Sequence, residues 1–303
     1  MDIFRYNVAV TDFQWFSLLA EQPGIDEVNF WQPSPSSIRD PVGTPWLFKL
    51  HSPKHFIVGG GIFVHYTKLP IGMAWEAFGI KNGVKSQTEM LSRVSKYRKS
   101  IVRDTDEIGC IVLSDPFFLD REEWIPIPND WKSNIVKGKH YDTREQIGSD
   151  LWLQVVARKA IASVSLLPQG PSVGKPILVT PRLGQGGFRT EVTDAYDRRC
   201  AISGERTLPV LEAAHIRPFS DVGSHDVRNG LLLRSDIHKL FDRGYVSIQP
   251  DGIFRVSQSL RADFQNGKVY YDMDGKAIRF PSDASKQPLT AHLDWHFSTQ
   301  FRE

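Results

Sequence analysis

The chain has 303 residues, 41% of them hydrophobic and 24% charged, which is enough for about two domains that each bury a core. We find no apolar run long enough to span a bilayer and no signal-peptide pattern, so we expect a cytoplasmic protein with no membrane partner. The formal net charge of +2 is only mildly favourable to a polyanion, and charge alone does not predict nucleic-acid binding.

The first 165 residues contain short apolar and aromatic runs that Pro, Gly and Asn interrupt, a pattern typical of a small, partly closed β-barrel. Residues 69–80 and 86–104 are the exception and predict helices. The second predicted helix has Leu91, Val94 and Ile101 on one side. Its other side is basic and is either a solvated face or a phosphate-tracking one; it comprises Arg93, Lys96, Arg98, Lys99 and Arg103.

Six segments in this part of the chain together resemble the strands and loops of a known superfamily. They are VAVTD (8–12), NFWQPS (29–34), GTPWLFKL (43–50), FIVGGGIF (56–63), LSDPFF (113–118) and EEWIPIP (122–128). Residues 1–134 thereby resemble the PUA-like superfamily, which includes EVE, ASCH and YTH domains. The resemblance implies a β-barrel that binds a modified nucleobase in an aromatic pocket, where an extruded base regains stacking.

The residues expected in such a pocket are flat or polar side chains near the quoted segments. Trp31 is the first choice, with Phe30 beside it, and Trp46, Asp115 and Trp124 follow. Aromatic residues in a barrel also build its core, so a buried core position is the alternative role for each aromatic residue named.

The segment LLPQGPSVGKPI, residues 166–177, has three prolines and is typical of an interdomain linker. We therefore predict an α+β protein with a PUA-like domain at residues 1–165, a linker at 166–180 and a second domain at 181–303.

The second domain contains LEAAHIRPFSDVGSHDVRNGLLLRSDIHKLFDRG at residues 211–244. His215 ends an apolar stretch that predicts a strand, Asn229-Gly230 is a turn dipeptide, and His238 lies in a short helical pattern. Phosphodiester hydrolysis needs a base for water and a cation on the phosphate. One histidine on a strand that faces another on a helix can supply both.

Residues 181–256 resemble the HNH endonucleases with a ββα-metal fold. The resemblance implies that His215 is the general base, that Asn229 braces the loop and that His238 binds a divalent ion such as Mg²⁺, Mn²⁺ or Ni²⁺. Many members have an Asp or His ligand just before the base, where this chain has Ala214. Asp242, one helical turn after His238, is the replacement we favour, and Asp236 and the side chain of Asn229 are the alternatives.

Three further features bear on this domain. Cys110 and Cys200 are the only cysteines, and Cys200-Ala-Ile-Ser203 has no second pair, so no structural zinc is expected. Arginines around the motif are candidates for phosphate contacts or for solvated surface charges: Arg182, Arg189, Arg198, Arg199, Arg217 and Arg234. His292 and His296, one turn apart without an acidic partner between them, are expected on the surface.

A base-binding barrel joined to an HNH nuclease resembles a modification-dependent restriction endonuclease. This resemblance implies recognition of 5-methylcytosine or 5-hydroxymethylcytosine in double-stranded DNA and cleavage with a one-metal site, and it is compatible with a homodimer. Two alternatives stay open at this point: an HNH nuclease without modification dependence, and a catalytically silent nucleic-acid-binding module.

Overall fold

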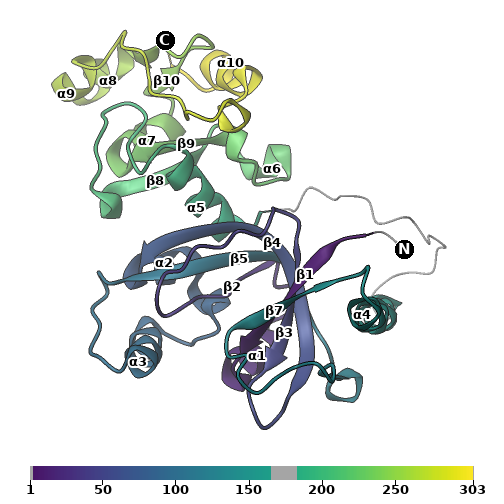
Figure 1. Cartoon of the computed structure of the whole chain (residues 1–303). Coiled ribbons are helices and arrows are strands. Elements are labelled where there is room, and N and C mark those ends of the chain that lie inside the picture. Colours follow the sequence, from purple (N-terminus) through teal and green to yellow (C-terminus); the bar gives the residue numbers. More distant parts are fainter. Residues whose placement is uncertain (1–2, 165–182, 303) are drawn as a thin grey trace. The chain divides into compact units, whose positions relative to one another are not determined.

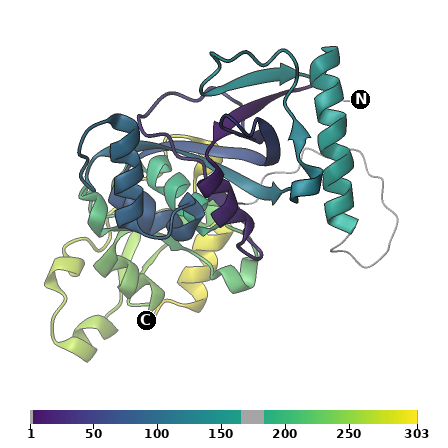
Figure 2. The ribbon, with the colours of Figure 1, turned by 90° about the horizontal axis from the view of Figure 1, so that it is seen from below.

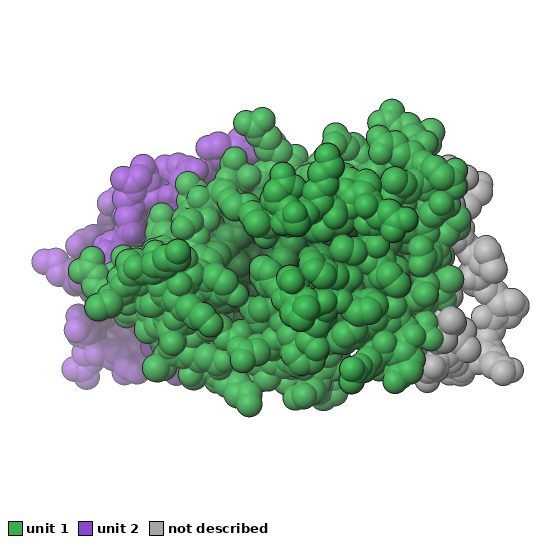
Figure 3. Space-filling view, turned by 60° about the horizontal axis from the view of Figure 1, so that its bottom comes forward, with its two compact units in different colours: residues 1–182 green, residues 183–303 purple. Residues whose placement is uncertain are grey.

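The computed structural model describes residues 3–164 and 183–302 (Figure 1). The predicted linker, residues 166–180, and Arg182 lie outside the described residues. The chain divides into two compact units, Met1–Arg182 and Leu183–Glu303 (Figure 3). Both combine strands and helices, which confirms the predicted α+β class. No helix among the described residues is long and apolar enough to cross a membrane.

Unit 1 is built on a seven-stranded sheet in the order β2-β5-β4-β3-β1-β7, with β6 paired to β4. The strands are β1 (Arg5–Thr11), β2 (Glu27–Asn29), β3 (Pro45–Leu50), β4 (Phe56–Pro70), β5 (Glu107–Phe118), β6 (Ile125–Pro126) and β7 (Gly138–Asp142). Only β1 and β3 pair in parallel. Gly59 and Gly60 let β4 approach its neighbours, because an added Cβ would lie 2.3 Å from the Phe117 carbonyl oxygen and 2.6 Å from that of Trp46.

Four helices accompany this sheet: α1 (Phe13–Ala20), α2 (Ile71–Phe78), α3 (Gln87–Arg98) and α4 (Gln146–Val164), the last lying beside β7 (Figure 2). The two predicted helices are confirmed as α2 and α3. Ile101 was predicted on the apolar side of the second helix, but it is 96% exposed. The helix ends at Arg98, because Lys99 adopts a left-handed conformation with φ 55°.

The strands of unit 1 send alternate side chains to separate cores, as the two-residue period of a strand requires. On β5, Ile111 and Leu113 join the core that α1 covers, whereas Cys110 and Val112 join the core that α2 and α3 cover. A third core lies between β1, β3, β7 and α4. Helices on both sides therefore bury most of the sheet.

Unit 2 is organised around an antiparallel hairpin followed at once by a helix. Strand β8 (Leu211–His215) pairs with β9 (Gly230–Arg234), with His215 opposite Gly230, and α7 (Ser235–Asp242) packs on both strands. Helix α5 (Gln185–Ala195) packs against the same hairpin. This ββα arrangement is the one predicted from the motif.

The remaining elements of unit 2 complete a single core. They are η3 (Leu208–Val210), α6 (Phe219–Val222), η4 (Val227–Asn229), β10 (Val246–Ile248), β11 (Phe254–Val256), α8 (Ser259–Phe264), α9 (Lys268–Tyr271), η5 (Ala284–Lys286) and α10 (Thr290–Thr299). Cys110 and Cys200 are buried free thiols in units 1 and 2 respectively.

Candidate active site

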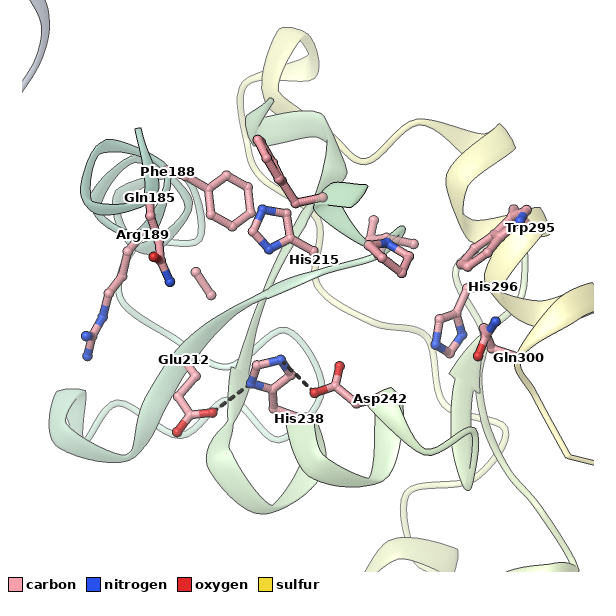
Figure 4. Close-up of a pocket in the computed structure, with 14 residues that line it drawn as sticks. Gln185, Phe188, Arg189, Glu212, His215, His238, Asp242, Trp295, His296 and Gln300 are labelled. Carbon is pink, nitrogen blue, oxygen red and sulfur yellow. Dashed lines mark hydrogen bonds and ion pairs between the residues drawn. The ribbon is translucent and has the colours of Figure 1, made fainter. Parts of the chain in front are cut away.

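A cavity of about 490 Å³ opens in unit 2 between α5, β8, α7 and α10 (Figure 4). It brings together three of the residues predicted for catalysis and metal binding: His215 from the end of β8, and His238 and Asp242 from α7. The other residues that line it are Gln185, Phe188, Arg189, Glu212, Ala213, Ile216, Pro218, Phe219, Trp295, His296 and Gln300.

His238 lies between two carboxylates (Figure 4). Its Nδ1 is 2.7 Å from Glu212 Oε2, and its Nε2 is 3.4 Å from Asp242 Oδ2. An ion about 2.1 Å from each donor can bridge that second pair, so His238 Nε2 and Asp242 fit a divalent cation. Burial, with Glu212 nearby, holds the pKa of Asp242 above its usual range.

Within residues 3–164 and 183–302, no group of three or more His, Cys, Asp or Glu side chains is arranged to hold a metal ion. The two alternative ligands are engaged elsewhere. Asp236 receives two hydrogen bonds from Arg234 and one from Tyr270, and Arg234 lowers the pKa of that carboxyl to about 2. The side chain of Asn229 is bound to the backbone of Arg217, so Asp242 is the partner that the geometry favours.

Asn229 is fully buried, and its amide joins the two sides of the loop that follows β8. Its Oδ1 accepts the Arg217 N–H at 2.9 Å, and its Nδ2 donates to the Arg217 carbonyl at 2.9 Å. Its own carbonyl accepts the Ile216 N–H. These bonds fix the backbone on the C-terminal side of His215.

The His215 ring stacks on Phe188, with centroids 4.0 Å apart and an interplanar angle of 10°. Its Nε2 is 3.0 Å from His225 Nδ1. Burial, followed by the nearby His225 and His238, lowers the pKa of His215 to about 4. The ring is therefore neutral at neutral pH and has a lone pair with which to accept a proton.

The candidate phosphate-binding arginines are in different environments. Arg189 lines the cavity, and the Arg217 guanidinium lies 4.9 Å from the centre of the Trp295 ring, which also lines it. Arg234 is paired with Asp236, and Arg199 does not line the cavity. Arg189 and Arg217 are thus the two whose positions suit a phosphate at this site.

The five predicted base-pocket residues of unit 1 are divided between two cores and the surface, although Phe30, Trp46 and Trp124 share one of those cores. Phe30 and Trp46 pack in the core under α1, while Trp31, only 9% exposed, packs in the core under α2 and α3 and donates to the Asn82 carbonyl. Trp124 donates to the Leu119 carbonyl, and Asp115 is exposed with φ 45°. Neighbours such as Phe30 and Trp31 face opposite sides of the sheet, which separates them.

A smaller cavity of about 230 Å³ does open in unit 1, between α1 and α3. It is lined by Asp12, Phe13, Gln14, Arg93, Lys96 and Tyr97. Phe13 and Tyr97 are 43% and 47% exposed, so their rings are accessible. Part of the predicted basic face is neutralised there, because Arg93 pairs with Glu89 and lies 3.5 Å from Asp12.

Three residues of the site, Glu212, His225 and Phe188, could not be recognised from the motif alone. The signal for Glu212 was a carboxylate within an apolar strand, two residues before Ala214 and so on the same face.

The expectation that His296 is on the surface is wrong, since it is 3% exposed and contacts the Ser247 hydroxyl and the Phe241 carbonyl. Its neutral ring packs flat against Phe241, at a centroid distance of 3.6 Å.

Comparison with known proteins agrees with this site. Residues 200–249 match the family model described as HNH endonuclease, a span that contains His215, Asn229, His238 and Asp242. The match lies within residues 181–256, and it confirms the predicted resemblance of that segment to HNH endonucleases. No curated protein matches the chain.

Among solved structures, the chain is similar to ASCH from Zymomonas mobilis, with 10% identity and a TM-score of 0.31, over 50% of this chain and 94% of that one. A point mutant of the same protein gives 9% identity and a TM-score of 0.33 over 50% and 97%. The modification-dependent TagI restriction endonuclease gives 12% identity and a TM-score of 0.30, over 98% of this chain and 81% of that one.

Proposed function

We propose that the protein is a metal-dependent DNA endonuclease whose active site comprises His215, His238 and Asp242. The observation that carries the proposal is geometric: a neutral histidine at the end of β8 and a histidine–aspartate pair on α7 line the same cavity. Hydrolysis of a phosphodiester requires a base and a cation at neighbouring points. The HNH match over residues 200–249 supports the same assignment.

Each side chain has a distinct task in this proposal. His215 accepts the proton of the attacking water. His238 Nε2 and Asp242 would hold a divalent ion, which would supply stabilisation of the negative charge on the phosphate and the leaving oxygen. Glu212 accepts the Nδ1–H of His238 and so leaves Nε2 unprotonated toward Asp242. A histidine nitrogen and a carboxylate would suit Mg²⁺ or Mn²⁺, with Ni²⁺ as a further candidate.

A paired set of variants tests these roles. His215→Ala should reduce plasmid cleavage by about 10²–10⁴-fold while DNA binding stays within a few-fold, because a neutral imidazole adds little to phosphate affinity. Asp242→Asn should raise the Mn²⁺ concentration needed for cleavage by about tenfold or more, and calorimetry should show the same loss in Mn²⁺ binding. Asp236→Asn, the same change on the same helix but outside the cavity lining, is the control. Equal metal dependence in the two aspartate variants would remove Asp242 from the site.

We further propose that the substrate is double-stranded DNA with modified cytosine and that unit 1 recognises the modification. The resemblance of residues 1–134 to PUA-like domains motivates this step. The accessible rings of Phe13 and Tyr97, which line a cavity together with Arg93 and Lys96, are better placed to stack on an extruded base than the buried Trp31.

Phage DNA with plain, methylated or hydroxymethylated cytosine separates the alternatives in one assay with Mg²⁺ or Mn²⁺. Cleavage of modified DNA alone supports modification dependence, and Tyr97→Ala should then reduce that preference by about tenfold or more. Equal cleavage of all three DNAs would establish an HNH nuclease without modification dependence. Binding without cleavage would contradict the nuclease proposal.

A further inference from the structure

His225 lies in the segment between α6 and η4, within residues 211–244 but not among the three residues that predicted the site, His215, Asn229 and His238. Its Nδ1 faces Nε2 of His215 at 3.0 Å. Each of the two rings is held by its own aromatic neighbour: His225 stacks on Phe219 at 4.3 Å and 20°, and His215 stacks on Phe188 at 4.0 Å and 10°. Both rings are thus oriented by packing, with the two nitrogens directed at each other.

One hydrogen can occupy the space between these two nitrogens, which leaves two arrangements for neutral rings. If His225 donates from Nδ1, the proton of His215 is on its own Nδ1, and neither nitrogen of His215 can accept a proton from water. If His215 donates from Nε2, its Nδ1 keeps a lone pair. Figure 4 shows the ring of His215 at the edge of the space above His238, where that lone pair is needed.

We propose that His225 is a positioning residue that accepts the Nε2–H of His215 and so selects the tautomer in which His215 Nδ1 is the base. The inference rests on the proposed endonuclease function. In the step itself, an O–H bond of the attacking water breaks, the new N–H bond forms at Nδ1, and the electron pair of the O–H bond stays on the attacking oxygen. The Nε2–H remains on His215 throughout, and its bond to His225 strengthens because the donor ring becomes positive.

This pair differs from a histidine oriented by a carboxylate, because the acceptor is uncharged. An imidazole fixes the tautomer without adding a negative charge beside a phosphate that already carries one. The arrangement therefore keeps His215 neutral, with its proton on Nε2, beside the phosphate of the proposed substrate.

Two variants separate the acceptor from the packing. His225→Phe keeps a ring against Phe219 but removes the acceptor, and His225→Asn places an amide oxygen at about the position of Nδ1. We expect His225→Phe to lower kcat by about 10- to 100-fold with KM for DNA within about threefold, because part of the general-base contribution is lost. His225→Asn should recover most of kcat. Full activity in His225→Phe, or equal loss in both variants, would overturn the proposal.

A measurement that does not need cleavage tests the same point. In the full-length protein labelled with ¹⁵N-histidine, long-range ¹⁵N–¹H spectra report which ring nitrogen carries the proton, and His215→Ala assigns the signals. We expect His215 to be the Nε2–H tautomer in the wild type and in His225→Asn, and a mixture of tautomers in His225→Phe. An Nδ1–H tautomer in the wild type would refute the role of His225. If that spectrum is as expected but the wild type cuts no DNA, the endonuclease proposal fails while the tautomer assignment stands.

Discussion

Replacing Asn229 by alanine tests whether this residue braces the loop or takes part in the chemistry. The substitution removes two hydrogen bonds to the backbone of Arg217 and leaves the partly buried N–H and carbonyl of Arg217 without those partners. Lost bonds and unsatisfied groups of this kind together cost about 2–4 kcal/mol. We expect this loss to lower the free energy needed to open the loop locally. Amide hydrogen exchange around Arg217 should then accelerate by about 30- to 1000-fold.

Hydrogen exchange of the full-length protein, followed by mass spectrometry of peptides that cover residues 214–219, measures this effect. Asn266→Ala is the control, because Asn266 is exposed and its amide oxygen makes only a local bond to the Gly267 N–H. Cleavage by Asn229→Ala should fall, with the Mn²⁺ dependence unchanged. Lost cleavage with exchange no faster than in the control would show that Asn229 acts on the substrate or the ion, and the bracing argument would be wrong.

Three further outcomes follow from the geometry. Glu212→Ala should weaken Mn²⁺ binding by about 10- to 100-fold in calorimetry, because His238 loses the acceptor that orients it, and Glu205→Ala, outside the cavity lining, should not. Burial lowers the pKa of His296 to about 4, so between pH 6.5 and 4 the unfolded chain binds a proton that the folded chain excludes, and stability falls as the pH falls. His296→Gln should therefore remove about 2–3 kcal/mol of the difference in unfolding free energy between pH 7 and pH 4.5. Trp31→Ala should lower the free energy of unfolding of unit 1 by about 3–5 kcal/mol in urea titrations, since it leaves a cavity in a core. An unchanged midpoint of urea unfolding would instead support the predicted role of Trp31 in a base pocket.

The nuclease motif could be predicted from the sequence because its geometry is local. His215, Asn229 and His238 lie within one hairpin and the helix that follows it, so strand alternation, a turn dipeptide and a helical pattern are enough to place them in one ββα unit. Asp242 followed from the same reasoning, since positions four apart on a helix share a face.

The base pocket could not be predicted in this way. Phe30 and Trp31 are neighbours in the sequence, yet one packs under α1 and the other under α2 and α3. Contacts between distant segments determine which face of a sheet a helix covers. A local run of aromatic residues therefore does not predict it. The cavity that did form takes its rings from α1 and α3, where the exposed Phe13 and Tyr97 were not distinguished by any motif.

His225 and Glu212 complete the site from within the same segment, residues 211–244, although the pattern of His215, Asn229 and His238 does not mark them. Each contacts one of the two histidines on the nitrogen that faces away from the proposed chemistry. An imidazole with both nitrogens unassigned can present either tautomer, and only one of them leaves a lone pair where it is needed. A proton on His215 Nδ1 or on His238 Nε2 would block the base or the ligand, so the residues that fix these tautomers determine whether the two histidines can act. The recognised pattern thus supplies the reacting groups, and the side chains between and beside them set their protonation.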